Sequence, residues 1–146
     1  MIFGHKKRQI NRLLIVEDEP LIAFDNEIFL QGADYEVVAT VNSAEDALLI
    51  LSKRADQVDA VLLDYNLAGP ASGRDVAELA TEKGIRVLFV TGHCPEGVDH
   101  LAMGCLLKPY THKHLHAALE AMERIASGKM PKSVPNQLKL FTTDQV

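Results

Sequence analysis

The chain has 146 residues, of which 47% are hydrophobic, and its formal net charge is −5. This is enough apolar material for one domain with one buried core, and it excludes a chain that is disordered throughout. The uncharged runs are only as long as strands, and the first residues lack the apolar stretch of a secretory signal, so the sequence excludes a membrane span and a signal peptide.

Charge is distributed unevenly along the chain. Residues 1–12 contain four basic side chains and no acidic one, and residues 127–146 are also slightly basic, so the body between them is strongly acidic. Because a protein that binds nucleic acid presents a basic face to the phosphates, this distribution argues against nucleic acid as the main partner. Cys94 and Cys105 are too few for a disulfide scaffold and suit a cytoplasmic protein.

Five short apolar runs are predicted to form buried strands, with helical patterns between them. The first run, Leu13–Val16, stops at three acidic residues, and Pro20 then suits the first position of a helix. Leu21, Phe24 and Ile28 recur at helical spacing and are expected to form the apolar face of this helix. The later strand-like runs are Tyr35–Val41, Ala60–Leu63, Ile85–Val90 and Cys105–Leu107.

Three further helices are predicted. Ser43, with Asp46 three residues later, has the pattern of a helix start; a short helix covers Val76–Ala80; and Thr111 caps a final helix that ends at Gly128. Apolar strands that alternate with helices indicate a doubly wound α/β domain, with a five-stranded parallel sheet between two layers of helices.

Polar residues stand where four of these strands end. Glu17 and Asp18 follow the first strand, Asp64 the third, Thr91 the fourth and Lys108 the fifth, and the carboxyl ends of parallel strands meet at one edge of the sheet. Three carboxylates together repel one another unless a cation lies among them, and Mg²⁺ suits a site with few oxygen ligands. A carboxylate nucleophile, a metal, a fixed cation and a hydroxyl donor are the groups that phosphoryl transfer to an aspartate requires.

Four motifs around these positions resemble the receiver domain of bacterial two-component response regulators, over residues 12–124. They occur in the family's order, and they are Leu-Leu-Ile-Val-Glu17-Asp18-Glu-Pro, Val-Leu-Leu-Asp64-Tyr-Asn66-Leu, Phe-Val-Thr91-Gly-His and Leu-Leu-Lys108-Pro-Tyr. The resemblance implies the flavodoxin-like receiver fold, a basic arm at residues 1–11, a receiver domain at 12–127 and a flexible tail at 128–146. It also implies a cis peptide bond before Pro109.

The resemblance assigns a role to each site residue. Asp64 is expected to be phosphorylated, and Mg²⁺ to be bound by Asp18, Asp64 and the backbone carbonyl of Asn66, with Glu17 acting directly or through a water. Lys108 is expected to pair with the phosphoryl group, and Thr91 to hydrogen-bond it and move inward. The expected phosphodonor is a sensor histidine kinase or a histidine phosphotransfer protein. With eighteen residues after Gly128, a single-domain regulator is expected, acting on a protein partner or as a phosphorelay shuttle.

Two positions depart from the family pattern. Cys105 stands where the family usually has an aromatic residue, and it is expected to be a buried free thiol. Only sixteen residues separate Thr91 from Lys108, fewer than is usual, so the family's fourth helix is expected to be short or replaced by a loop. Dimerisation through that helix is therefore in doubt.

Other interpretations stay open. The fold also suits a Mg²⁺-dependent phosphohydrolase with an aspartyl-phosphate intermediate, although Asn66 stands where such enzymes carry a second aspartate. It suits an interaction domain that is not phosphorylated as well.

Two local features also have more than one interpretation. His112 and His116 share a helical face that suits either a metal or solvent. Residues 137–141 resemble a peptide that binds the replication sliding clamp, and the alternative is that they fold back as an extra strand.

Overall fold

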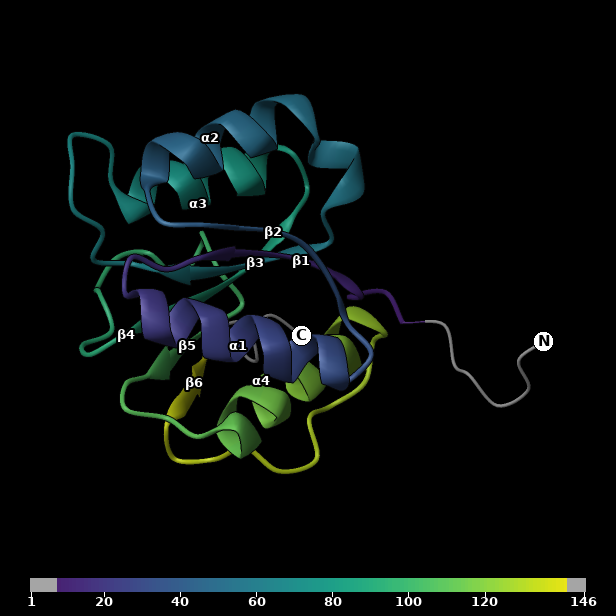
Figure 1. Ribbon diagram of the computed structural model, residues 1–146. Coiled ribbons are helices and arrows are strands. Elements are labelled where there is room, and N and C mark those ends of the chain that lie inside the picture. Colours follow the sequence, from purple (N-terminus) through teal and green to yellow (C-terminus); the bar gives the residue numbers. More distant parts are fainter. Residues whose placement is uncertain (1–7, 142–146) are drawn as a thin grey trace.

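One sheet of six strands forms the centre of the molecule in a computed structural model that describes residues 8–141 (Figure 1). The strand order is β2-β1-β3-β4-β5-β6; the first five strands are parallel and β6 is antiparallel to β5. The strands are β1 (Arg12–Val16), β2 (Glu36–Val41), β3 (Ala60–Asp64), β4 (Arg86–Thr91), β5 (Gly104–Leu107) and β6 (Leu138–Leu140). The predicted α/β fold with its five parallel strands is therefore confirmed.

Helices cover both faces of the sheet, with α2 and α3 on one face and α1 and α4 on the other (Figure 1). Alternate residues of β1 point to opposite faces of the sheet. Leu14 and Val16 pack with α2 and α3, whereas Leu13 and Ile15 pack with α1 and α4. The helices are α1 (Pro20–Gly32), α2 (Ala44–Lys53), α3 (Gly73–Glu82) and α4 (His112–Ala126), with a short 3₁₀ turn at Ala55–Gln57.

The helix starts agree with the predicted capping residues. The side chain of Ser43 accepts a hydrogen bond from the backbone N–H of Asp46 at the start of α2, and Thr111 forms a capping box with His114 at the start of α4. These side chains satisfy backbone N–H groups that have no partner within their helix. Each cap lies just beyond a strand and so sets the point where the chain turns back along the sheet.

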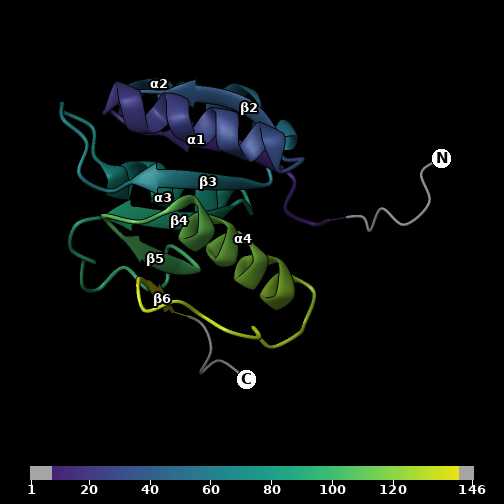
Figure 2. The ribbon, with the colours of Figure 1, turned by 60° about the horizontal axis from the view of Figure 1, so that its bottom comes forward.

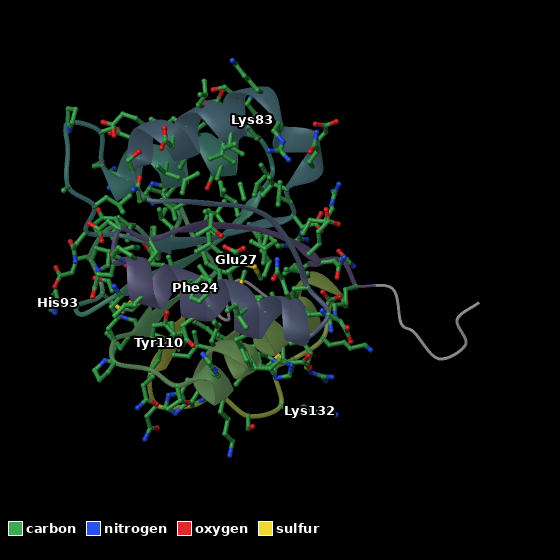
Figure 3. All side chains as sticks on the ribbon, in the orientation of Figure 1. Phe24, Glu27, Lys83, His93, Tyr110 and Lys132 are labelled. Atoms are coloured by element: carbon green, nitrogen blue, oxygen red, sulfur yellow. A yellow bond between two sulfur atoms is a disulfide. The ribbon has the colours of Figure 1, made fainter. Side chains whose placement is uncertain are left out.

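The predicted buried face of α1 is wrong. The side chains that turn to solvent are Leu21, Phe24 and Ile28, which are 84%, 64% and 53% exposed. Phe24 is labelled on α1 in Figure 3. Ala23, Asn26 and Leu30 are buried instead, and the Asn26 amide donates to the Tyr110 hydroxyl at 2.8 Å. The exposed set and the buried set of residues both recur at helical spacing, so periodicity alone does not tell which set faces the sheet.

Within the predicted tail, residues 138–141 form β6 and its continuation at the edge of the sheet (Figure 2). Leu138 is buried, and the backbone N–H of Phe141 donates to the carbonyl of Met103 at 2.9 Å. The alternative of an extra strand is confirmed, and it uses the leucines of the clamp-like peptide within this domain. A strand at this position also covers the otherwise unpaired edge of β5.

The end of the predicted basic arm is also ordered against the domain. The backbone N–H groups of Gln9 and Ile10 donate to the two carboxylate oxygens of Glu123 on α4, at 3.0 and 2.9 Å, and Ile10 is buried. Residues 8–11 of the predicted basic arm therefore lie against the domain, where Ile10 is buried and the Glu123 carboxylate accepts hydrogen bonds from two backbone N–H groups. Residues 1–7 and 142–146 of the predicted arm and tail lie outside the described residues.

Gly104 permits the close approach of β6. A Cβ atom at this position would lie 2.7 Å from the backbone carbonyl oxygen of Lys139. We expect Gly104→Ala to lower the free energy of unfolding by about 1–2 kcal/mol, because the strand must shift to relieve this contact. Urea denaturation measures the loss, and faster amide hydrogen exchange at residues 138–141 locates it. Gly32→Ala, where a Cβ meets nothing within 4 Å, is the control, and an equal effect of both changes would contradict the prediction.

Candidate functional site

The carboxyl ends of β1, β3, β4 and β5 bring the predicted site residues together. Glu17 follows β1, Asp64 and Thr91 are the last residues of β3 and β4, and Lys108 follows β5. Glu17, Asp64 and Thr91 are buried although they are polar, and a buried polar side chain requires a partner. Parallel pairing in register accounts for the convergence, because these strands all run toward the same edge of the sheet.

Three carboxylates form the acidic part of the site. Oxygen atoms of Glu17, Asp18 and Asp64 all lie within 4.8 Å of one another. Carboxylate oxygens at this spacing fit a hard divalent cation such as Mg²⁺, which prefers oxygen ligands and keeps several waters. Asn66 lies beside them, since its backbone N–H donates to Asp64 Oδ1 at 3.1 Å.

Lys108 supplies a positive charge to these carboxylates. Its Nζ lies 3.3 Å from Glu17 Oε1, 3.5 Å from Asp64 Oδ2 and 3.3 Å from Glu19 Oε2. The peptide bond between Lys108 and Pro109 is cis, as the resemblance implied. Glu19 is a site residue that the sequence reasoning missed, although it follows directly on the acidic pair.

In the absence of a metal, the surroundings of Asp64 shift its carboxyl group toward the protonated form. Burial and the neighbouring Glu17 carboxylate together raise the pKa of Asp64 to about 7, against the opposing effect of Lys108. One lysine therefore does not fully compensate the buried negative charge. A divalent cation would favour the ionised form, so the raised pKa of Asp64 agrees with an acidic cluster that fits Mg²⁺.

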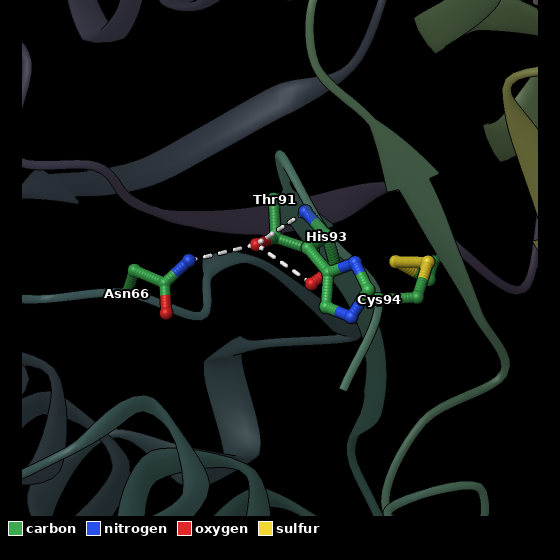
Figure 4. The surroundings of a disulfide bond; sticks show 5 residues. Asn66, Thr91, His93 and Cys94 are labelled. Carbon is green, nitrogen blue, oxygen red and sulfur yellow. Dashed lines mark hydrogen bonds between the residues drawn. A yellow bond between two sulfur atoms is a disulfide. The ribbon is translucent and has the colours of Figure 1, made fainter. Parts of the chain in front are cut away.

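Thr91 is held by hydrogen bonds to two neighbouring segments. The Asn66 amide donates to Thr91 Oγ1 at 2.9 Å, and the Thr91 hydroxyl donates to the backbone carbonyl of His93 at 3.2 Å (Figure 4). The hydroxyl proton is therefore engaged with the segment that follows β4. Any new acceptor for this proton has to compete with the His93 carbonyl.

A disulfide joins Cys94 to Cys105 beside this network (Figure 4). The prediction of a free thiol at Cys105 is wrong. Residues 92–103 contain no helix, and this loop returns Cys94 to β5, where the two Cα atoms are 6.1 Å apart. A spacing of eleven residues carries no sequence signal for such a pairing, because the pairing depends on the path of the loop.

Three histidines lie in the first turns of α4, at positions 112, 114 and 116, and among the described residues they do not form a metal site. His112 Nε2 lies 2.6 Å from Asp25 Oδ2, and the His112 ring stacks on Phe29. The His114 ring takes part in the capping box of Thr111, and His116 lies near Glu120 on α4. Within residues 8–141, the acidic cluster of Glu17, Asp18 and Asp64 is the group that brings metal-ligating atoms together.

A groove of about 790 Å³ borders the site along α1. It begins at Lys108 and Pro109 and passes Tyr110 and the exposed Leu21 and Phe24. Apolar side chains bordered by the charged Glu19, Asp25 and Lys108 suit a protein surface better than a small polar molecule. The exposed Leu21 and Phe24 of α1 thus line the same groove as Lys108 of the site.

A family model for the response regulator receiver domain matches residues 13–120, which include every site residue described above. The chain belongs to the response regulator receiver family. Receivers are signalling domains of two-component systems and interact with kinase or phosphotransfer partners. This membership agrees with the order of the four motifs and with the parallel core of the sheet.

Similar proteins include a curated regulator and solved structures. This receiver is 34% identical over 82 residues to the phyllosphere-induced regulator PhyR of Methylorubrum extorquens, covering 56% of this chain and 30% of that protein. It therefore spans less than a third of that relative. A response regulator receiver protein from Sinorhizobium medicae is 27% identical, with a TM-score of 0.64 and coverage of 75% of this chain and 90% of that one. The response regulator PhyR from Brucella abortus is 30% identical, with a TM-score of 0.58 and coverage of 73% and 44%.

Over residues 8–141, no helix has both the length and the apolar composition that a membrane crossing requires.

Proposed function

We propose that this receiver accepts a phosphoryl group on Asp64 in a Mg²⁺-dependent reaction. The observation that carries the proposal is a buried aspartate with Lys108 at 3.5 Å and two further carboxylates within 4.8 Å. A structural salt bridge would need one carboxylate for one lysine, whereas this site places an excess of negative charge at the end of a buried strand. Such an excess suits a site that binds a cation and then a phosphoryl group.

The chemistry is a transfer from phosphohistidine to a carboxylate. An oxygen of Asp64 attacks phosphorus, the P–N bond of the donor breaks, and the imidazole nitrogen keeps the electron pair and takes up a proton. Lys108 pairs with the phosphoryl oxygens. Mg²⁺, held by Glu17, Asp18, Asp64 and the carbonyl of Asn66, would neutralise charge on these oxygens.

Thr91 links this chemistry to a change in conformation. Its hydroxyl donates to the His93 carbonyl, and a phosphoryl group on Asp64 offers a more strongly charged acceptor. Transfer of this hydrogen bond releases the His93 carbonyl and with it residues 92–103. A protein partner that recognises the rearranged loop would provide the output, unless the phosphoryl group is passed on in a phosphorelay.

The groove along α1 suits the phosphodonor. The donor is a sensor histidine kinase or a histidine phosphotransfer protein, and its histidine has to reach Asp64 at the rim of the sheet. The exposed Leu21 and Phe24 lie on the wall of the groove that Lys108 borders. An apolar contact there would orient the donor without taking part in the transfer.

Intact mass spectrometry after incubation with acetyl phosphate and Mg²⁺ tests the proposal. We expect the wild-type protein to gain the mass of one phosphoryl group and Asp64→Asn to gain none, because the nucleophilic oxygen is lost. Asp56→Asn, an exposed aspartate at the opposite edge of the sheet, is the matched control and should behave as wild type. Chelation of Mg²⁺ by EDTA should prevent the gain.

Three other outcomes decide between the alternatives. Equal phosphorylation of wild type and Asp64→Asn would show that Asp64 is the wrong residue. Hydrolysis of a general phosphatase substrate beyond one equivalent would favour the phosphohydrolase. Failure of wild type to gain mass, under conditions where another receiver does, would favour an interaction domain that is not phosphorylated.

A further inference from the structure

The Cys94–Cys105 disulfide joins a loop to the sheet close to Thr91. Cys94 lies three residues after Thr91, within the helix-free residues 92–103, and Cys105 lies in β5. Figure 4 shows the sulfur atoms beside His93, whose backbone carbonyl accepts the hydrogen bond of the Thr91 hydroxyl. The covalent link is therefore adjacent to the segment that phosphorylation is proposed to move.

The two ends of the link differ in their freedom to move. Cys105 is fully buried and lies between Phe89 of β4 and Lys139 of β6 in the sheet register. Cys94 is only partly buried, and Pro95 and the exposed Gly97 follow it in the loop. A bond between them transfers the rigidity of the sheet to the loop, so the loop cannot move at Cys94 without disturbing β5.

The movement of the Thr91 hydroxyl depends on this restraint, because the hydroxyl donates a hydrogen bond to the same loop. To donate to a phosphoryl group, the hydroxyl has to leave the His93 carbonyl, and the neighbouring Cys94 holds that peptide in position. Asn66 binds the same hydroxyl oxygen from β3's end at 2.9 Å. With the disulfide present, the His93 carbonyl that accepts this hydrogen bond lies next to a residue that is covalently tied to β5.

We infer that Cys94 and Cys105 form a thiol–disulfide exchange site that controls the response to phosphorylation. The disulfide holds residues 92–103 in the resting arrangement and opposes the movement of Thr91, and reduction releases this restraint. This inference rests on the proposed function, because the regulated event is phosphorylation of Asp64. The chemical partner is a small thiol with its disulfide, such as glutathione.

The exchange has a defined direction, because Cys94 is partly exposed whereas Cys105 is buried. An external thiolate attacks the sulfur of the partly exposed Cys94, and Cys105 leaves as a thiolate that takes up a proton. A second external thiol then attacks the mixed disulfide and releases the Cys94 thiol. Overall two external thiols become one disulfide and the protein disulfide becomes two thiols; oxidised glutathione drives the reverse reaction.

The first measurement tests whether the pair exists and exchanges. Full-length protein is equilibrated with either dithiothreitol or oxidised glutathione, its free thiols are alkylated, and the intact mass is measured. We expect two alkylated cysteines after reduction and none after oxidation. Two alkylated cysteines after oxidation would overturn the inference, and so would glutathione on each cysteine without an internal bond.

The second measurement tests control of the site. Beryllofluoride, a phosphoryl mimic, is titrated with Mg²⁺ into both redox forms, and phosphorylation by acetyl phosphate is followed in parallel. We expect roughly tenfold weaker beryllofluoride binding to the oxidised form, which is a coupling of the size usual between linked sites. Cys94→Ser, which removes only the partly exposed sulfur, should match reduced wild type in both buffers.

The outcomes separate this inference from the proposed function. Equal beryllofluoride binding by the two redox forms, together with phosphorylation of both, would overturn redox control and leave Asp64 as the phosphoacceptor. Absence of binding and phosphorylation in both forms would contradict the proposed function and the regulation with it. A redox effect that persists in Cys94→Ser would show that the disulfide is not its cause.

Discussion

Asp64→Asn is expected to raise the free energy of unfolding of the metal-free protein at pH 8 by about 2 kcal/mol. The ionised Asp64 is buried beside Glu17, and these two influences raise its pKa to about 7. Asparagine has nearly the same shape and carries no charge, so it removes the repulsion. The gain is smaller than the full shift in pKa implies, because the amide NH₂ group also faces Lys108.

The expected pH dependence has a definite sign. In the folded protein the pKa of Asp64 is about 7, whereas in the unfolded chain it is close to the ordinary value of about 3.9. The folded state therefore binds the proton more tightly, and Asp64 lowers the stability of wild type progressively as the pH rises from about 4 to about 7. The advantage of asparagine should be complete at pH 8 and nearly absent at pH 4.

Urea denaturation of wild type and Asp64→Asn with EDTA, at pH 8 and pH 4.5, measures this difference. Asp56→Asn is the control, because Asp56 is exposed and lies away from the cluster. Excess Mg²⁺ at pH 8 should stabilise wild type more than the variant and narrow the gap. A loss of stability in Asp64→Asn at pH 8, or a gain that is unchanged at pH 4.5, would contradict the prediction.

The sheet and the site were predictable from the sequence because their signals are local. An apolar run that ends in a polar residue, as at Asp64, places that residue at the carboxyl end of a strand. Parallel connections then bring four such ends to one edge, so the neighbourhood of Glu17, Thr91 and Lys108 follows without knowledge of any long-range contact. The starts of α2 and α4 were predictable for the same reason, since a cap needs only a side chain and the next turn.

The features that the sequence did not predict, or predicted only as an alternative, all depend on distant segments. Burial of Asn26 in α1 requires Tyr110, which is 84 positions away, as a hydrogen-bond partner. Strand β6 was predicted only as an alternative, because it is too short to be recognised by pattern, and it forms because Gly104 leaves room for its backbone. The disulfide of Cys105 requires a loop path that no residue type in the loop specifies.

Lys108→Met is expected to lower the free energy of unfolding of the metal-free protein at pH 8 by about 3 kcal/mol. Methionine keeps the length and the apolar stem of lysine, so the change removes the charge and little packing. Two buried carboxylates, Glu17 and Asp64, are then left without their cation. An uncompensated buried charge costs more than an imperfectly paired one, because no water replaces the lost partner.

The dependence of this effect on pH and on Asp64 identifies its source. Burial lowers the pKa of Lys108, but Glu17 and Asp64 raise it by more, so the net pKa is raised. A raised lysine pKa means that the stabilisation is present below the unfolded pKa of about 10.4 and is lost only at higher pH. At pH 8 the lysine therefore contributes fully. As the pH falls below about 7 and Asp64 takes up its proton, the cost of removing the lysine should shrink.

A double-mutant cycle separates the contribution of the Lys108–Asp64 pair from the rest of the cluster. In the Asp64→Asn background we expect Lys108→Met to cost about 1–2 kcal/mol less than in wild type, because one buried charge is already absent. Urea denaturation of the four proteins in EDTA at pH 8 measures this coupling, and Lys113→Met on the exposed side of α4 is the matched control. Equal costs in both backgrounds would mean that Glu17 and Glu19 alone engage the lysine. In that case Asp64 would not interact with Lys108, and the proposed pairing of this lysine with a phosphoryl group on Asp64 would lose its support.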